Sequence, residues 1–156
     1  MKKIKLTQDK YVLVDDEDYA MLDKYDWHAK RTPKTFYAAR QIREKNGKQT
    51  TLRMHRFLIN APKESEVDHK DGNGLNNQKF NLRLATHSQN MMNKSKQVRN
   101  TSGFKGVSWD KTHKKWQAYI TLNRIQKNLG YFKSKQEAHQ ARSGATPVYH
   151  KEFAHI

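Results

Sequence analysis

The sequence contains no cysteine, and this absence removes several kinds of chemistry at once. Disulfide bonds, zinc sites built from thiolates and cysteine nucleophiles are all excluded. No apolar run approaches the roughly 18 residues that a membrane-spanning helix requires. The basic N-terminus is followed by neither a long apolar stretch nor a small-residue cleavage site, so it does not resemble a secretory signal. We therefore expect an intracellular protein.

Acidic residues are scarce, above all in the second half of the chain. The 156 residues include 31 Lys and Arg against 15 Asp and Glu, a net charge of +16. Between Met91 and Lys135 the only acid is Asp110. Such a balance implies a polyanionic partner, which could be DNA, RNA or an anionic membrane surface. No basic amphipathic helix stands out, so we expect a nucleic acid that runs along the C-terminal half and reaches the centre.

The chain is long enough for one ordinary domain or two small ones, and we expect the α+β class. We divide it into an α+β region at 1–60, a central region at 61–95, a basic linker at 96–102 and a strand-rich region at 103–156. In the first region we expect strands at 3–6 and 11–14, a short helix capped by Asp15 or Asp16, a hairpin of 36–42 with 50–54 around Asn46-Gly47, and a short helix that begins at His55.

The central region predicts a strand, a loop, a second strand and a helix. Residues 67–69 suit a short strand, and the Gly- and Asn-rich stretch 70–81 suits a loop. Residues 82–85 alternate as a returning strand does. Thr86 and Gln89 then form a capping box, in which Thr86 is the N-cap of the helix and Gln89 occupies its third position.

Four polar residues in this region have the types that phosphodiester hydrolysis with one metal ion needs. Asp68 and His69 are adjacent, Asn81 lies twelve positions after His69, and Asn90 lies nine further on. Asp68 and Asn90 offer hard oxygen ligands for a divalent cation. His69 points to the other side of the strand, where it suits a general base. Asn81 could hold the second ring nitrogen of His69.

Other interpretations of the same residues stay open. An Asn-rich loop is most often only a turn. An EF-hand calcium loop is disfavoured, because Gly72 comes one place too early and Lys79 stands where the bidentate Glu belongs. His87 could replace Asn90 as a ligand, whereas we expect His55 to pack or to hydrogen-bond locally.

Residues 67–93 resemble the HNH motif of phage and intron homing endonucleases, which are ββα-metal nucleases. The spacing matches the subgroup whose third letter is Asn, and the likeness extends to residues 6–29 and 52–59. The resemblance implies that Asp68 and Asn90 bind one Mg²⁺ or Mn²⁺, that His69 is the general base and that Asn81 orients it. It also implies products with a 5′-phosphate and a 3′-hydroxyl.

The strand-rich region resembles a DNA-binding domain of the APETALA/ethylene-response-factor type. The resemblance implies a three-stranded sheet that lies in the DNA major groove and packs on one helix. Ser134 and Glu137 form a second capping box, and we expect this helix to end near Arg142, because Gly144 and Pro147 follow. The likeness rests on residues 106–110, 115–120, 129–132, 137–138 and 153–154.

The expected DNA-binding face of this sheet follows from the period of two along a strand. Residues 116, 118, 120 and 122 form an apolar face toward the helix, and residues 117, 119, 121 and 123 form the face toward DNA. Cations, aromatics and hydrogen-bonding groups of this kind contact phosphates and base edges. The predicted DNA-binding residues are Lys105, Trp109, Lys111, Lys114, Gln117, Tyr119, Thr121, Arg124 and Lys127.

These observations together predict a metal-dependent, site-directed DNA endonuclease of the homing type in the cytoplasm of a bacterial or phage-infected cell. Its partner is double-stranded DNA, with no membrane and no protein partner implied. One catalytic motif per chain leaves monomer and dimer open. The alternative is a sequence-specific DNA-binding regulator with an inactive nuclease core. RNA binding ranks lower, because stacking on single strands favours exposed aromatics and most aromatics here look buried.

Overall fold

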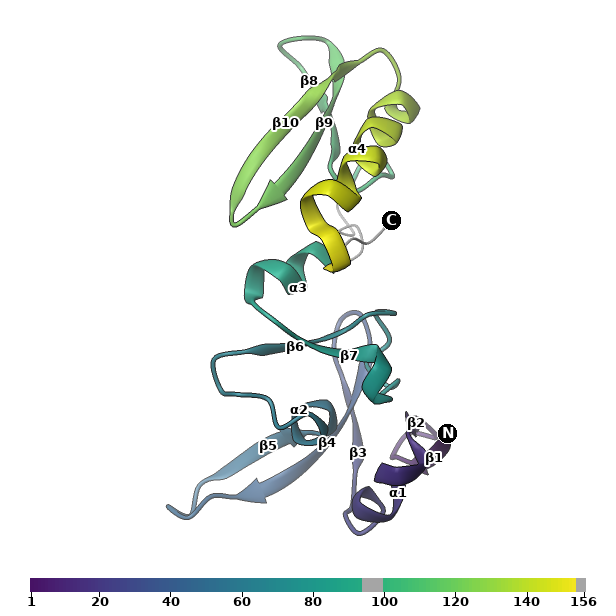
Figure 1. Cartoon of the computed structure of the whole chain (residues 1–156), viewed down its shortest axis with the longest axis vertical. Coiled ribbons are helices and arrows are strands. Elements are labelled where there is room, and N and C mark those ends of the chain that lie inside the picture. The colour runs from purple at the N-terminus through teal and green to yellow at the C-terminus, as the bar shows by residue number, and fades with distance from the viewer. Residues whose placement is uncertain (94–99, 154–156) are drawn as a thin grey trace. The chain divides into compact units, whose positions relative to one another are not determined.

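The computed structural model describes residues 1–93 and 100–153, and the chain divides into two compact units, Met1–Ala85 and Thr86–Ile156. Each unit combines short helices with small antiparallel sheets (Figure 1). The predicted α+β class is therefore confirmed. The division of the sequence into four regions stays a prediction.

The first unit contains three small sheets. Strands β1 and β2 form one sheet, β3, β4 and β5 the second, and β6 and β7 the third. The predicted hairpin is present, and Gly47 at its turn has a φ of 82°, in the left-handed region that favours glycine. The elements are β1 (Lys2–Lys5), β2 (Tyr11–Val14), α1 (Asp16–Leu22), β3 (His28–Arg31), β4 (Phe36–Arg43), β5 (Gln49–Arg53), α2 (Met54–Leu58), β6 (Glu66–His69), η1 (Lys79–Asn81) and β7 (Leu82–Ala85).

The core of the first unit joins its early elements. Val12, Val14, Leu22 and Met54 are fully buried and come from β2, α1 and α2. The apolar faces of these short elements are too small to be stable alone, so they become stable by burying one another. Strand β3 was missed from the sequence, because its four residues include two cations and carry little strand signal.

Asp15 was predicted as a helix cap, and the structure gives its side chain another role. It precedes α1, but no side-chain hydrogen bond caps the helix. Its carboxylate instead accepts hydrogen bonds from Gln78 Nε2 at 3.2 Å and from the Lys79 backbone N–H at 2.8 Å. The acids that follow Asp15 do lie in the first turn of α1, as expected. Asp15 thus fastens a distant loop to the start of this helix.

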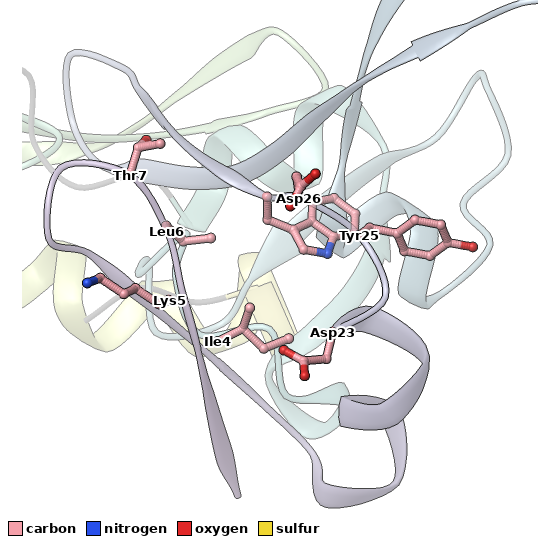
Figure 2. Close-up of a pocket in the computed structure, with 8 residues that line it drawn as sticks. Ile4, Lys5, Leu6, Thr7, Asp23, Tyr25 and Asp26 are labelled. Carbon is pink, nitrogen blue, oxygen red and sulfur yellow. The ribbon is translucent and has the colours of Figure 1, made fainter.

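A pocket of about 420 Å³ lies beside β1, in the first unit (Figure 2). Its walls are the end of β1 with the residues that follow it, and the segment between α1 and β3. It contains none of the residues that the sequence predicts for the site. The lining residues are Ile4, Lys5, Leu6, Thr7, Asp23, Tyr25, Asp26 and Trp27.

The second unit is a three-stranded antiparallel sheet packed on one helix, as predicted. The strand order is β10-β9-β8, and Val107, Ala118 and Ala138 are buried between the sheet and α4. The elements are α3 (His87–Asn93), β8 (Val107–Asp110), β9 (Lys115–Leu122), β10 (Ile125–Phe132), α4 (Lys135–His150) and η2 (Lys151–Phe153). Most of the predicted linker at 96–102 lies outside the described residues, which exclude 94–99.

Helix α4 runs past the point where the sequence predicted its end. The Ser134 hydroxyl accepts from the Glu137 N–H at 3.1 Å and so caps the helix, while the Glu137 carboxylate accepts from the Lys133 N–H at 3.3 Å. The helix then continues through Gly144 and Pro147 to His150. Its buried residues recur every four positions, at 138, 142, 146 and 150. Packing of this continuous stripe outweighs the local preference of Gly and Pro to end a helix.

Candidate functional site

The predicted strand–loop–strand segment forms as expected and places Asp68 and His69 on opposite faces. In the antiparallel β6–β7 pair, Asp68 lies opposite Arg83 and His69 lies opposite Leu82. Successive side chains of a strand point to opposite faces. Asp68 and His69 are both buried, although Asp and His usually lie at least partly exposed. Two buried polar neighbours need specific partners, and each has them.

Asp68 is held by an arginine that the sequence prediction did not include. Arg83 donates to Asp68 Oδ2 from Nε at 2.8 Å and from Nη2 at 2.7 Å. Both side chains are shielded from water, with relative exposures of 12% for Arg83 and 5% for Asp68. The guanidinium therefore balances a buried carboxylate charge. The signal for Arg83 was its place on the returning strand, but the register that pairs it with Asp68 was needed to recognise it.

His69 lies in a cluster of rings on the other face. The His55 ring packs edge-on against it with centroids 4.9 Å apart, and the Tyr37 ring lies at 5.7 Å. Burial lowers the pKa of His69 below its ordinary value, against a smaller opposing effect of its hydrogen bond to Asn77. Burial, followed by the nearby His69, lowers the pKa of His55 to about 2. Both rings are accordingly neutral near pH 7, and a neutral imidazole can accept a proton.

The amide that contacts His69 belongs to Asn77, and the expectation that Asn81 makes this contact is corrected. Asn77 Oδ1 lies 2.9 Å from His69 Nε2. The Asn81 side chain instead organises the loop. Its Nδ2 donates to Asp71 Oδ1 at 3.0 Å and to the Asn76 carbonyl at 2.8 Å, and its Oδ1 accepts from the Asp71 N–H at 3.1 Å. A catalytic role of Asn81 remains a prediction.

The loop that carries Asn77 is fastened to the rest of the first unit. The Leu13 N–H donates to the Leu75 carbonyl and the Asn77 N–H donates to the Leu13 carbonyl, each at 2.8 Å. The Gly74 N–H donates to Thr35 Oγ1 at 3.2 Å. A Cβ atom on Gly74 would stand 2.4 Å from the Phe36 carbonyl oxygen, so only glycine fits this close approach to β4.

The helix predicted to carry Asn90 is present and begins as expected. The Thr86 N–H donates to Gln89 Oε1 at 2.8 Å, and the Gln89 N–H donates to Thr86 Oγ1 at 3.3 Å, which completes the capping box. Asn90 lies in the first turns of α3, where its N–H donates to the Thr86 carbonyl at 3.0 Å. His87 is the first residue of α3 and is exposed. Because α3 belongs to the second unit, a shared site of Asn90 and Asp68 stays a prediction.

The predicted sheet faces of the second unit are largely correct. Ala118 and Ile120 on β9 are buried toward α4, while Gln117, Tyr119 and Thr121 alternate with them and lie on the open face. The cations Lys111, Lys114 and Arg124 are exposed in the two hairpin turns. Arg124 has a φ of 68° and Lys114 one of 50°, as residues in tight turns adopt.

Two predicted DNA-binding residues lie on the helix side of the sheet. Trp109 pairs directly with Trp116, and their rings meet edge-on at 5.3 Å, so they share a face. Lys127 pairs with Ile120, and its Nζ lies 4.7 Å from the centre of the Tyr149 ring on α4. The reason is a bulge between Asn128 and Gly130 that reverses the alternation of β10.

Lys105, another predicted DNA-binding residue, precedes β8 and contacts the end of helix α3. Its Nζ donates to the Met92 carbonyl at the end of α3, at 2.6 Å. Carbonyl groups in the last turn of a helix lack intrahelical donors and attract cations. Lys105 therefore helps to attach α3 within the second unit.

Among the described residues no group of three or more His, Cys, Asp and Glu side chains gathers as a metal cluster. A site of one carboxylate and one amide oxygen, as the sequence predicts, would not form such a group. Asp68 supplies a carboxylate and Asn90 an amide oxygen, and both are hard donors. The donor chemistry thus fits a hard divalent cation.

Residues 60–92 match the HNH endonuclease family. The match covers β6, the loop, β7 and most of α3. The chain therefore carries an HNH endonuclease domain in this segment.

Two relatives extend this similarity beyond the motif. Protein 3.8 of Escherichia phage T7 is 43% identical over 68 residues, which cover 44% of this chain and 56% of the phage protein. A protein of Acanthamoeba polyphaga mimivirus, named as an uncharacterized HNH endonuclease, is 31% identical over 109 residues, or 66% of this chain and 56% of that protein. The chain thus spans little more than half the length of these relatives. No solved structure matches it.

In the part of the chain that the structure describes, no helix combines the length and the apolar character needed to cross a membrane.

Proposed function

We propose that this protein is a metal-dependent, site-directed DNA endonuclease of the homing type. The observation that carries the proposal is the buried Asp68–His69 pair, whose carboxylate and imidazole have separate partners on opposite faces of β6. Burial keeps His69 neutral, as a general base requires. The match of residues 60–92 to HNH endonucleases supports the same conclusion.

His69 would take the proton from the attacking water. The water oxygen forms a bond to phosphorus, the bond from phosphorus to the 3′ oxygen breaks, and the 3′ oxygen takes a proton from solvent. The products carry a 5′-phosphate and a 3′-hydroxyl. His69 Nε2 faces Asn77 Oδ1 at a distance of 2.9 Å.

Asp68 and Asn90 would hold one Mg²⁺ or Mn²⁺ ion. Such an ion, when bound, relieves charge on the phosphate and stabilises the leaving 3′ oxygen. Arg83 fixes the orientation of the Asp68 carboxylate through Oδ2. Asn81 supports the site by holding the loop around Asp71 and Asn76.

The C-terminal sheet would supply affinity for duplex DNA and the position of the cut. Its open face presents polar side chains that can read base edges, and the turns at its ends present cations for phosphates. The net charge of +16 favours association of the protein with DNA. The set retained from the prediction consists of the open-face residues Gln117, Tyr119 and Thr121 and the turn cations Lys111, Lys114 and Arg124.

The test compares the wild-type protein with His69→Ala on phage or host DNA in Mg²⁺ and in Mn²⁺. On a denaturing gel the wild type should give discrete products, and the variant should lose about 10²- to 10⁴-fold in rate, as expected for loss of a general base. A mobility-shift assay should give the same affinity for both proteins. Cleavage by the variant at the wild-type rate would refute the assignment of His69.

The arginine at Asp68 favours a second candidate, a sequence-specific DNA-binding regulator with an inactive core. In that case the Arg83 guanidinium stands permanently in place of a cation as the partner of the Asp68 carboxylate. This candidate predicts a mobility shift on target DNA with no cleavage in any divalent metal. It also predicts that His69→Ala changes neither observation.

A further inference from the structure

The buried side-chain amide of Asn77, in the loop between β6 and β7, makes a contact that the sequence does not reveal. Asn77 is fully buried, and its Oδ1 lies 2.9 Å from His69 Nε2. Its Nδ2 has no hydrogen-bond partner among the residues that the structure describes. A buried amide with one unsatisfied donor costs free energy, so a hydrophobic residue of the same size would be the simpler choice for packing alone.

The backbone of Asn77 is fixed independently of its side chain. Its N–H donates to the Leu13 carbonyl at 2.8 Å, next to the bond from the Leu13 N–H to the Leu75 carbonyl. These bonds join the loop to β2, whose Val12 and Val14 are fully buried in the core. The amide oxygen is therefore presented to His69 from a rigid support, and a change of the Asn77 side chain leaves the support intact.

Two further rings limit how His69 can turn. His55 packs edge-on at 4.9 Å and is buried, and Tyr37 lies 5.7 Å from His69 and 5.2 Å from His55. A ring packed against two neighbouring rings can rotate freely only if these neighbours move. The contact between His69 and Asn77 is thus well defined in space.

We propose that Asn77 is the positioning residue for His69, and that it fixes the imidazole in the tautomer with the proton on Nε2 and the lone pair on Nδ1. An amide oxygen cannot donate, so the nitrogen facing it must carry a proton. A neutral ring has only one N–H, which leaves Nδ1 as the proton acceptor. This inference rests on the proposed nuclease function and gives Asn77 the role that the sequence assigned to Asn81.

The tautomer of His69 tests the inference without any cleavage assay. The 156-residue chain is labelled with ¹⁵N in its eight histidines, and the signal absent from His69→Ala identifies His69. The wild type should show a protonated Nε2 and an unprotonated Nδ1 at neutral pH. A wild-type His69 with its proton on Nδ1 would overturn the proposal, whether or not the protein cuts DNA.

Two matched substitutions then separate the effect of the Asn77 amide oxygen from the effect of the side-chain volume. Asn77→Leu keeps the size and removes the oxygen, whereas Asn77→Asp keeps an oxygen acceptor and, like Leu, lacks the Nδ2 donor. We expect Asn77→Leu to mix the tautomers of His69 and to lower the cleavage rate by about 10- to 100-fold, the usual effect of losing such an orienting partner. Its affinity for DNA in EDTA should equal that of the wild type.

Asn77→Asp should retain the Nε2-protonated ring and cut faster than Asn77→Leu. The opposite order would mean that Asn77 acts through packing, because packing favours Leu and penalises a buried charge. Wild-type protein that does not cleave in any metal would refute the proposed function, while the tautomer measurement would still decide the role of Asn77.

Discussion

Polar groups are used in contrasting ways in the β6–β7 segment of the first unit and in the sheet of the second. In the first, Asp68, His69 and Asn77 are buried, and each is held by a specific neighbour. In the sheet of the second unit, Thr121 on the open face and the cations of the turns are exposed. Catalysis needs a few groups in fixed positions, and the loss of one of them has a large effect on the reaction rate. Many exposed groups suit binding to a polyanion, where each contributes little.

Removal of metal should give the largest difference between the two regions, because it should abolish cleavage and leave DNA binding intact. In EDTA, cleavage should fall to background, because Asp68 and Asn90 are proposed to act through a cation. DNA binding should persist, because the sheet cations do not depend on metal. A denaturing gel and a mobility shift on the same DNA measure the two quantities. Loss of binding together with cleavage would show that the site and the sheet are not separate in function.

The buried pair in the site should matter more for stability than an exposed pair in the same unit. Arg83→Met removes the guanidinium and leaves the buried Asp68 carboxylate without it, so the free energy of unfolding should fall by about 3 kcal/mol. The matched control is Glu17→Gln, because Glu17 and Lys79 form an exposed ion pair of 2.7 Å. This change should cost less than about 1 kcal/mol. Urea denaturation followed by circular dichroism measures both, and equal losses would contradict the distinction.

The burial of His55 makes the stability of the first unit depend on pH. Its pKa is about 2 in the folded protein, because burial disfavours the charged ring, and near 6.5 when unfolded. The unfolded chain therefore binds a proton below pH 6.5 that the folded chain does not, so stability falls as pH falls. Between pH 7 and pH 5 this amounts to about 2 kcal/mol.

His55→Phe removes this titration while it keeps an aromatic ring against Tyr37 and His69. Its unfolding free energy, measured in urea between pH 5 and pH 7, should decline less than that of the wild type. Other buried groups, His69 among them, should leave part of the decline. The same slope in both proteins would mean that His55 is protonated in the folded state.

Local signals in the sequence predicted much of this molecule. Helix caps form within four residues, so Thr86 with Gln89 and Ser134 with Glu137 could be recognised without knowledge of the fold. The partner of His69 could not be recognised in this way. Asn77 reaches His69 because this part of the loop pairs with Leu13 of β2, more than sixty residues earlier in the chain, and local sequence does not show that pairing.

The two misplaced sheet residues teach different lessons. The alternation of β8 already placed Trp109 on the side of Val107, so a strict period of two would have assigned it to the helix face. Lys127 needed the register of β10. Leu129 is an extra residue that the bulge leaves unpaired and that packs toward the core, and this reverses the faces of the residues before it.

The position of Lys127 also provides the finest test of the contrast between site and sheet. Each cation that contacts phosphate adds about 0.9 to the slope of log affinity against log salt concentration. Lys111→Gln, in the exposed turn after β8, should therefore weaken binding slightly and lower this slope by about 0.9. Lys127→Gln removes the same charge from the helix side, where its Nζ lies over the Tyr149 ring, and should leave the slope unchanged. Because both variants alter the net charge equally, equal slopes for them would mean that DNA responds to total charge rather than to the open face of the sheet.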